Sequence, residues 1–129
     1  MSKLARAVCV TVTMSMPMLA FAQGATTAFD GNYRGVSREL EAGRMSSSTG
    51  STRSCPPGGI PAPLTIANGI ARAGTADNPM EGSVTPQGVL VMRTPAGGKF
   101  EGQVDGQGKA AGRFHISCSY QIVWQRRPR

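Results

Sequence analysis

Residues 99–124 read KFEGQVDGQGKAAGRFHISCSYQIVW, and apolar and polar side chains alternate along most of this segment. From residue 114 onward, the even positions carry large apolar side chains or cysteine: Phe114, Ile116, Cys118, Tyr120, Ile122 and Trp124. Because the side chains of a strand point alternately to its two faces, this spacing predicts one buried and one solvated face. We expect a single long strand here, bent around a curved or barrel-like sheet.

The first half of the segment predicts the partner of that strand. Phe100, Gly102 and Val104 alternate with polar residues, and residues 106–108, Gly-Gln-Gly, suit a three-residue hairpin loop. This loop predicts two pairs of opposite charge and one aromatic pair: Asp105 with Lys109, Glu101 with Arg113, and Phe100 with Phe114. A slip of one residue would turn every core side chain outward, so we predict this register.

Two more turn signals lie upstream. Asn68-Gly69 separates two short apolar runs, and so does the Pro-Gln-Gly sequence at 86–88. The run that follows, residues 89–92, is apolar on both faces, which indicates a central or doubly covered strand. The best helix candidate is residues 36–45, where we expect one or two turns at most.

Together these signals predict an all-β fold. Glycine and proline, 17 and 9 residues, punctuate the chain between short apolar runs. We expect a small antiparallel barrel or sandwich of about 6–8 strands with one disulfide. A barrel mouth could hold a small apolar ligand, but aromatic residues are few, and we expect side chains to fill the interior. Residues 46–54, SSSTGSTRS, predict a flexible Ser/Thr/Gly-rich loop.

The N-terminal segment has the three parts of a secretory signal peptide. Lys3 and Arg6 form a positive start, and residues 7–19 are uncharged and mostly apolar. Residues 20–22, Ala-Phe-Ala, match the small-x-small cleavage pattern. A transmembrane anchor is the alternative, but proline and glycine interrupt a stretch that would need about 20 apolar residues. We expect a signal peptide over 1–22 and a single β domain over 23–129, periplasmic or secreted.

Two cysteines remain after such processing, Cys55 and Cys118. In an oxidising compartment an isolated pair is most simply a disulfide, and Cys118 falls on the predicted buried face. Closing so long a loop would stabilise the fold by about 4 kcal/mol. The alternative, a metal site with His115, lacks the roughly four ligands that a tetrahedral ion needs. We predict the disulfide, and no metal or cofactor.

The sequence offers no strong catalytic motif. His115 is the only histidine, and its parity places it on the solvent face, so we interpret it as a surface residue. The serines cluster in residues 46–54, where no base could be held beside them. Asp30, Glu81 and Glu101 could supply paired carboxylates, but their parity places them on outer faces. We therefore expect a protein that is not an enzyme.

The formal net charge is +7, and most of the positive charge is arginine. Arg126, Arg127 and Arg129 are a candidate anion-binding group, because arginine prefers phosphate and carboxylate partners. The alternative is a solvated tail that aids solubility. Nucleic acid is not expected, since the solvent-facing positions lack interleaved aromatic residues. A protein or an anionic component of the cell envelope is the partner we expect.

Two short motifs carry a resemblance to a known type of protein. The chain has Phe-Asp-Gly-x-Tyr-x-Gly at residues 29–35 and a Cys-x-aromatic strand that ends in a basic residue at 118–126. In these it is similar to small exported bacterial proteins of uncharacterised function. The resemblance implies a compact β-barrel or sandwich with one disulfide and carries no catalytic residues. The serine-rich insertion before Cys55 departs from the usual short spacing.

A looser likeness is to the periplasmic inhibitors of secreted metalloproteases. Those are also small exported β-barrels with one disulfide, and they insert a flexible N-terminal segment into the protease cleft. Residues 23–28 would take that role here. Our leading hypothesis is a non-catalytic binding or envelope-associated domain, and a periplasmic protease inhibitor is the alternative.

Overall fold

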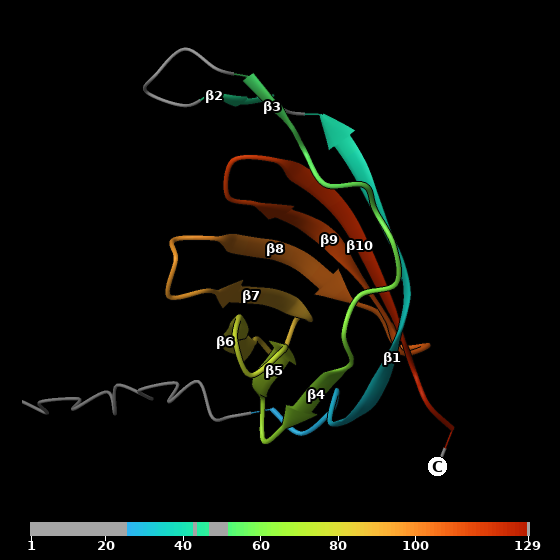
Figure 1. Ribbon diagram of the computed structural model, residues 1–129. Helices are drawn as coiled ribbons and strands as arrows, with labels where there is room; N and C mark the ends of the chain where they lie inside the picture. The colour runs from blue at the N-terminus through green and yellow to red at the C-terminus, as the bar shows by residue number, and fades with distance from the viewer. Residues whose placement is uncertain (1–25, 43, 47–51, 129) are drawn as a thin grey trace, which may run out of the picture.

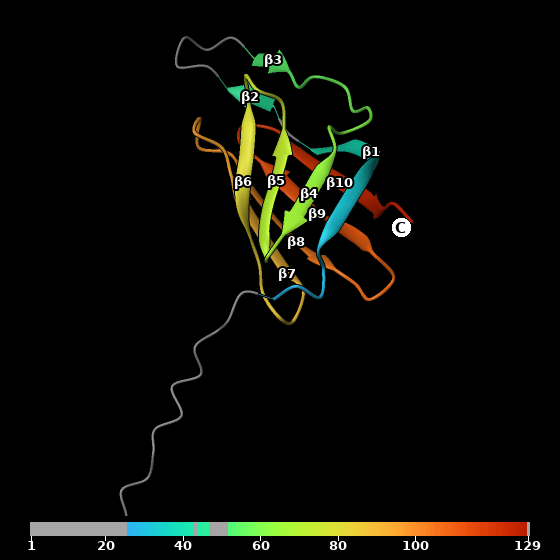
Figure 2. The ribbon, with the colours of Figure 1, turned by 90° about the horizontal axis from the view of Figure 1, so that it is seen from below.

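The computed structural model describes residues 26–42, 44–46 and 52–128. Eight antiparallel strands form a closed barrel in the order β1-β10-β9-β8-β7-β6-β5-β4 (Figures 1 and 2). The strands of the barrel are β1 (Gly31–Ala42), β4 (Leu64–Ala67), β5 (Ile70–Gly74), β6 (Pro79–Val84), β7 (Val89–Arg93), β8 (Lys99–Val104), β9 (Lys109–His115) and β10 (Ser119–Arg126). The predicted all-β antiparallel class is confirmed, with a barrel rather than a sandwich as its form.

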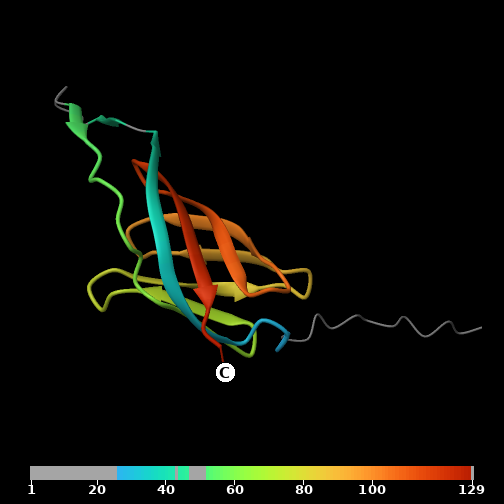
Figure 3. The ribbon, with the colours of Figure 1, turned by 90° about the vertical axis from the view of Figure 1, so that its right-hand side faces the viewer.

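The chain builds the barrel as a meander that its first strand closes. From β4 to β10, each strand pairs with the next along the chain. β1 pairs with β10 over most of its length and with the start of β4 through Gly31, Asn32 and Tyr33. Between β1 and β4 the chain leaves the barrel, and β2 (Arg44–Ser46) pairs with β3 (Thr52–Ser54) beyond one end (Figure 3).

That small hairpin overlaps the segment predicted as a flexible loop, residues 46–54. Ser46 pairs with Thr52, so both flanks of the segment form strands. Residues 47–51 lie outside the described residues, as do the expected signal peptide at 1–22 and the last residue, Arg129.

The predicted helical turns over residues 36–45 are wrong, because the described residues of this segment, 36–42 and 44–45, lie in β1 and β2. Arg38-Glu39-Leu40-Glu41-Ala42 favours a helix by intrinsic propensity, but such preferences are below about 1 kcal/mol per residue. Pairing with β10 over the same residues outweighs them. Val36 and Leu40, which a helix would turn toward the core, are 43% and 41% exposed.

The single long strand predicted from Phe114 to Gln125 is also wrong, because the chain turns in its middle. β9 ends at His115, residues 116–118 form the turn, and β10 begins at Ser119. Phe114 pairs with Tyr120, so even positions stay on the inner face on both sides of the turn. The alternation therefore continues through the turn and does not reveal it.

The three predicted hairpins are confirmed. Asn68 and Gly69 both have positive φ at the β4–β5 turn, and residues 86–88 lie between β6 and β7. In the β8–β9 hairpin, Glu101 lies opposite Arg113 and Phe100 opposite Phe114, in the predicted register. Asp105 and Lys109 also meet, through a hydrogen bond of 2.9 Å from the Lys109 backbone to the Asp105 carboxylate. The ion pairs differ from the prediction, because Glu101 pairs with Lys99 along its own strand, and Arg113 pairs with Glu41 of β1.

Strand β7 is central, as every barrel strand is, but it is not doubly covered. Leu90 and Met92 are fully buried inside the barrel, whereas Val89 on the outer face is 40% exposed. In the described part of the chain, the apolar outer face of β7 lies under no second layer.

The core lies inside the barrel and is densest in its middle. Its largest fully buried side chains are Trp124, Tyr33, Phe100, Leu64, Ile66, Leu90 and Met92. The Phe100 and Trp124 rings meet edge to face, with centroids 5.2 Å apart. Gly82, Gly102 and Gly112 let neighbouring strands approach closely, because a Cβ on any of them would collide with the facing backbone, and the Phe100 ring lies over Gly102.

The two ends of the barrel differ. We call the end with the β4–β5, β6–β7 and β8–β9 turns the closed end, and the opposite end the mouth. At the closed end, carbonyl groups of Gly69, Gly88 and Gly108 accept hydrogen bonds from the backbone of the neighbouring strand end. Tyr33 donates its hydroxyl to the Phe29 carbonyl, and Arg126 packs against Gly108, so side chains seal this end.

Candidate binding pocket at the barrel mouth

A pocket of about 460 Å³ opens at the mouth. Its apolar surface comes from the mouth ends of β6 and β9, from most of the length of β10 and from the segment before β4, through Met80, Phe114, Tyr120, Ile122, Trp124, Ile60, Pro61 and Ala62. Side chains therefore fill the closed end and the middle of the interior, but not the mouth.

One wall of the pocket is the segment at residues 55–63, which we call the strap. It leads from β3 to β4 and runs alongside β1 (Figure 3). Arg38 of β1 and Gly59 of the strap exchange two backbone hydrogen bonds, of 2.7 and 2.8 Å. Gly58 and Gly35 permit this close approach, because a Cβ at either position would collide with a carbonyl oxygen of the facing segment.

The predicted disulfide between Cys55 and Cys118 is present and fastens the start of the strap to the β9–β10 turn. Both cysteines are buried. Two aromatic residues of β10 hold the rest: Tyr120 donates its hydroxyl to the Pro56 carbonyl at 2.7 Å, and Trp124 donates Nε1 to the Ala62 carbonyl at 2.8 Å. With their polar atoms bonded to the strap, both residues present mainly apolar ring surface to the pocket.

Arg38 is the only charged residue among the described residues that line this pocket. Its guanidinium carbon lies 5.4 Å from the centre of the Tyr120 ring, within the range of a cation–π contact. Its Nε atom is buried and has no hydrogen-bond partner in the described part of the chain. Leaving a buried donor unpaired costs about 1–3 kcal/mol, and more when the group is charged.

Sequence reasoning missed Arg38, because its direction depends on a β-bulge. Gly35 pairs with Trp124, but the next pair is Ser37 with Val123, so Val36 is an extra residue. The bulge reverses the parity of the strand and places Arg38 opposite Ile122, an inward residue. Strict alternation from Tyr33 would instead have placed Arg38 outside.

The polar rim of the pocket lies across from Arg38. Thr94 is buried at the start of the β7–β8 turn, and its Oγ1 accepts a hydrogen bond of 2.8 Å from the Gly98 backbone. Thr75 and Asn78 belong to the β5–β6 connection, where Asn78 N–H bonds to Thr75. These groups can accept or donate hydrogen bonds to a molecule in the pocket.

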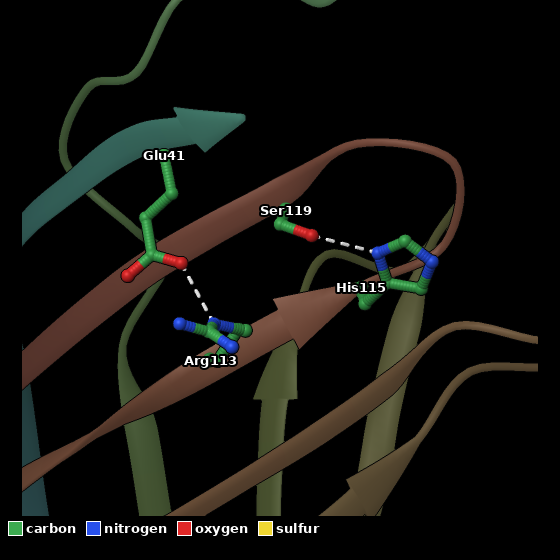
Figure 4. Close-up of polar contacts among 4 residues, drawn as sticks. All are labelled: Glu41, Arg113, His115 and Ser119. Atoms are coloured by element: carbon green, nitrogen blue, oxygen red, sulfur yellow. Dashed lines mark hydrogen bonds and ion pairs between the residues drawn. The ribbon is translucent and has the colours of Figure 1, made fainter. Parts of the chain in front are cut away.

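His115 lies outside the barrel and is exposed, as its parity predicted. Its Nδ1 is 2.8 Å from Ser119 Oγ, beside the ion pair of Arg113 and Glu41 (Figure 4). The sequence reasoning did not foresee the Ser119 contact, because it requires the turn at residues 116–118. The nearby carboxylates are engaged elsewhere: Glu41 binds Arg113, and a hydrogen bond from Lys99 lowers the pKa of Glu101.

Arg126 and Arg127 of the candidate anion-binding group line the same two surface hollows near the closed end, together with Pro128. Arg126 packs at the closed end against Gly31 and Gly108, and Arg127 is exposed, its backbone N–H bonded to the Asn32 carbonyl. Arg129 lies outside the described residues. Arg126 also affects Tyr33, because burial raises the pKa of the Tyr33 hydroxyl while the charge of Arg126 opposes that rise.

The other proposed carboxylates do not meet. Asp30 accepts hydrogen bonds from the Asn68 and Gly69 backbone at the closed end, and Glu81 pairs with Arg72 on the outer surface. Within the described residues, no three His, Cys, Asp or Glu side chains group as metal ligands.

Comparison with protein-family models, with curated proteins and with solved structures finds no match to this chain. In the described ranges there is also no helix long and apolar enough to cross a membrane.

Proposed function

We propose that this protein is a non-catalytic binding protein that holds one small, mainly apolar molecule in the mouth pocket. The observation that carries the proposal is a preformed pocket with an apolar floor at the mouth of an otherwise filled barrel. Its volume, about 460 Å³, is in the range of ordinary ligand sites. Barrels of eight strands are just wide enough either to be filled by side chains or to hold one small ligand.

The disulfide is compatible with an oxidising, extracytoplasmic location. We propose in addition that residues 1–22 act as a signal peptide and that the protein works in the periplasm or is secreted.

The contacts of Thr26 do not support the alternative of a protease inhibitor. Thr26 already packs against Gly69 at the closed end, and Ala28 N–H bonds to Thr26 Oγ1. A segment that inserts into a protease would therefore be confined to the residues before Thr26.

The first experiment is native mass spectrometry of the protein recovered from the cells that make it. We expect a fraction of the protein to carry additional mass, and release of that molecule under denaturing conditions would identify the ligand. Bare protein that also fails to bind any compound of an apolar panel would contradict the proposal.

The second experiment uses the single tryptophan of the chain. Trp124 lines the pocket, so its emission should shift when an apolar probe binds. Asn78→Phe on the exposed rim should block the pocket and weaken binding by about tenfold or more. Ser83→Phe is the matched control, because Ser83 is exposed on the outer wall. Equal binding by both variants would place the probe outside the mouth.

A further inference from the structure

The mouth pocket pairs an apolar surface with one positive charge. Of the described residues that line it, Arg38 is charged and none is acidic. If the ligand were neutral and apolar, the positive charge of the Arg38 guanidinium would face it without a negative partner. The charge of the pocket therefore matches a ligand that carries a single negative charge on an apolar body.

The position of Arg38 indicates a built site. The Val36 bulge turns it toward the pocket, the Tyr120 ring supports one face of its guanidinium, and the Gly59 bonds fix its backbone. Such support reduces the freedom that an arginine loses on binding. The charge is held in place but has no protein anion among the described residues, because no salt bridge of this part of the chain includes Arg38.

The chemistry of guanidinium selects the anion. Its planar donors match the two oxygens of a carboxylate, and such charge-assisted hydrogen bonds are roughly twice as strong as neutral ones. A doubly charged phosphate would need a second cation, and the described lining holds Arg38 alone. Since a cavity of about 150 Å³ holds a benzene ring, the mouth has room for a two-ring or comparable aliphatic body.

We propose that the ligand of the mouth pocket is an apolar carboxylic acid, bound as its carboxylate by the guanidinium of Arg38. This rests on the proposed function and deepens it. Burial of the apolar body would supply most of the affinity, and Arg38 would supply the preference for the ionised acid over neutral relatives.

The test compares acids with the matching primary amides, which keep the shape and lose the charge. We would titrate wild-type protein by calorimetry at neutral pH with 2-naphthoate, decanoate and cyclohexanecarboxylate, each beside its amide. At least one acid should bind about tenfold or more tightly than its amide, the ratio expected for a hydrogen bond between charged groups. This comparison needs no variant and so does not depend on a mutant's folding.

Three variants locate the effect. Arg38→Gln should remove the preference, so that each acid and its amide bind with similar affinity, and Arg38→Lys should retain part of the preference. Arg72→Gln is the control, since Arg72 forms an exposed ion pair with Glu81 on the outer wall. A preference that survives Arg38→Gln in folded protein would overturn the assignment of Arg38.

The remaining outcomes separate the two proposals. Equal binding of every acid and its amide would overturn the carboxylate inference and leave the apolar binding function standing. Binding of none of the compounds, together with bare protein in native mass spectrometry, would overturn the binding function itself.

Discussion

The two ends of this barrel are built differently. At the closed end, short turns with glycine let the backbone make its own bonds, and Tyr33, Asp30 and Arg126 are all engaged there. At the mouth, a strap of nine residues held by a disulfide forms one wall, and Arg38 Nε stays unpaired. Most polar groups around the mouth are bonded as well, so Arg38 Nε stands out as the one buried side-chain polar atom of the described residues that has no partner.

The largest effect should come from the mouth. Replacing both cysteines, Cys55→Ser with Cys118→Ser, removes the cross-link that fastens the strap to the β9–β10 turn. We expect a loss of about 2–5 kcal/mol in the free energy of unfolding, measured in urea, together with weaker ligand binding. A double variant as stable as the wild type would show that the other strap contacts suffice without the disulfide.

The second prediction compares one turn glycine at each end. Gly88 at the closed end has φ +85°, and a Cβ there would collide with the Val104 carbonyl, so Gly88→Ala should cost about 1–3 kcal/mol. Gly97 near the mouth has φ +92° but open space around it, so Gly97→Ala should cost about 1 kcal/mol. Thermal unfolding of both variants measures the difference. Equal losses would mean that backbone strain, rather than packing, dominates at both ends.

The third prediction concerns Tyr33 at the closed end. Tyr33→Phe removes the hydrogen bond to the Phe29 carbonyl and should cost about 1 kcal/mol. Because burial raises the pKa of Tyr33, the folded state keeps the phenol neutral. The contribution of neutral Tyr33 to the free energy of unfolding should therefore be complete below the usual tyrosine pKa of about 10. It should be lost as the pH rises further, through the raised pKa of the folded state.

Urea unfolding from pH 8 to pH 11 tests this sign. Above pH 10 the wild type should lose stability more steeply than Tyr33→Phe does. Parallel curves would mean that Tyr33 ionises as easily in the folded protein as in the unfolded chain.

The smallest effect should come from the outer surface of the barrel, beside the β9–β10 turn (Figure 4). Arg113→Gln breaks the ion pair with Glu41, and the Arg113 side chain is 64% exposed. We expect a change of less than about 1 kcal/mol, reduced further at high salt. A larger loss in chemical unfolding would show that this pair helps to close β1 onto the barrel.

Local signals predicted most of the barrel. The β8–β9 register followed from turn length, charge and aromatic pairing, and the structure has Glu101 opposite Arg113 as expected. The turn at residues 116–118 could not be found in this way. With a turn of three residues, Phe114 and Tyr120 still both point inward. The alternation of apolar and polar side chains is therefore the same for one long strand and for two strands joined by this turn.

The candidate site was less predictable than the fold. Cys55 and Cys118 were identified from composition, but Arg38 enters the pocket through a one-residue bulge that no local motif announces. The strap likewise depends on contacts between segments distant in sequence, such as Trp124 with Ala62. A single sequence carries periodicity and turn chemistry. The bulge that turns Arg38 inward and the contacts of the strap arise only when strands distant in sequence meet.

The way β1 closes the barrel also sets the order in which the protein can fold. From β4 to β10, every pairing joins neighbours along the chain and closes only a short loop. The main partner of β1 is β10, the last strand, so this contact closes the longest loop at the greatest entropic cost. We therefore expect the meander to assemble first, with the pocket-bearing seam between β1 and β10 forming in the final step of folding.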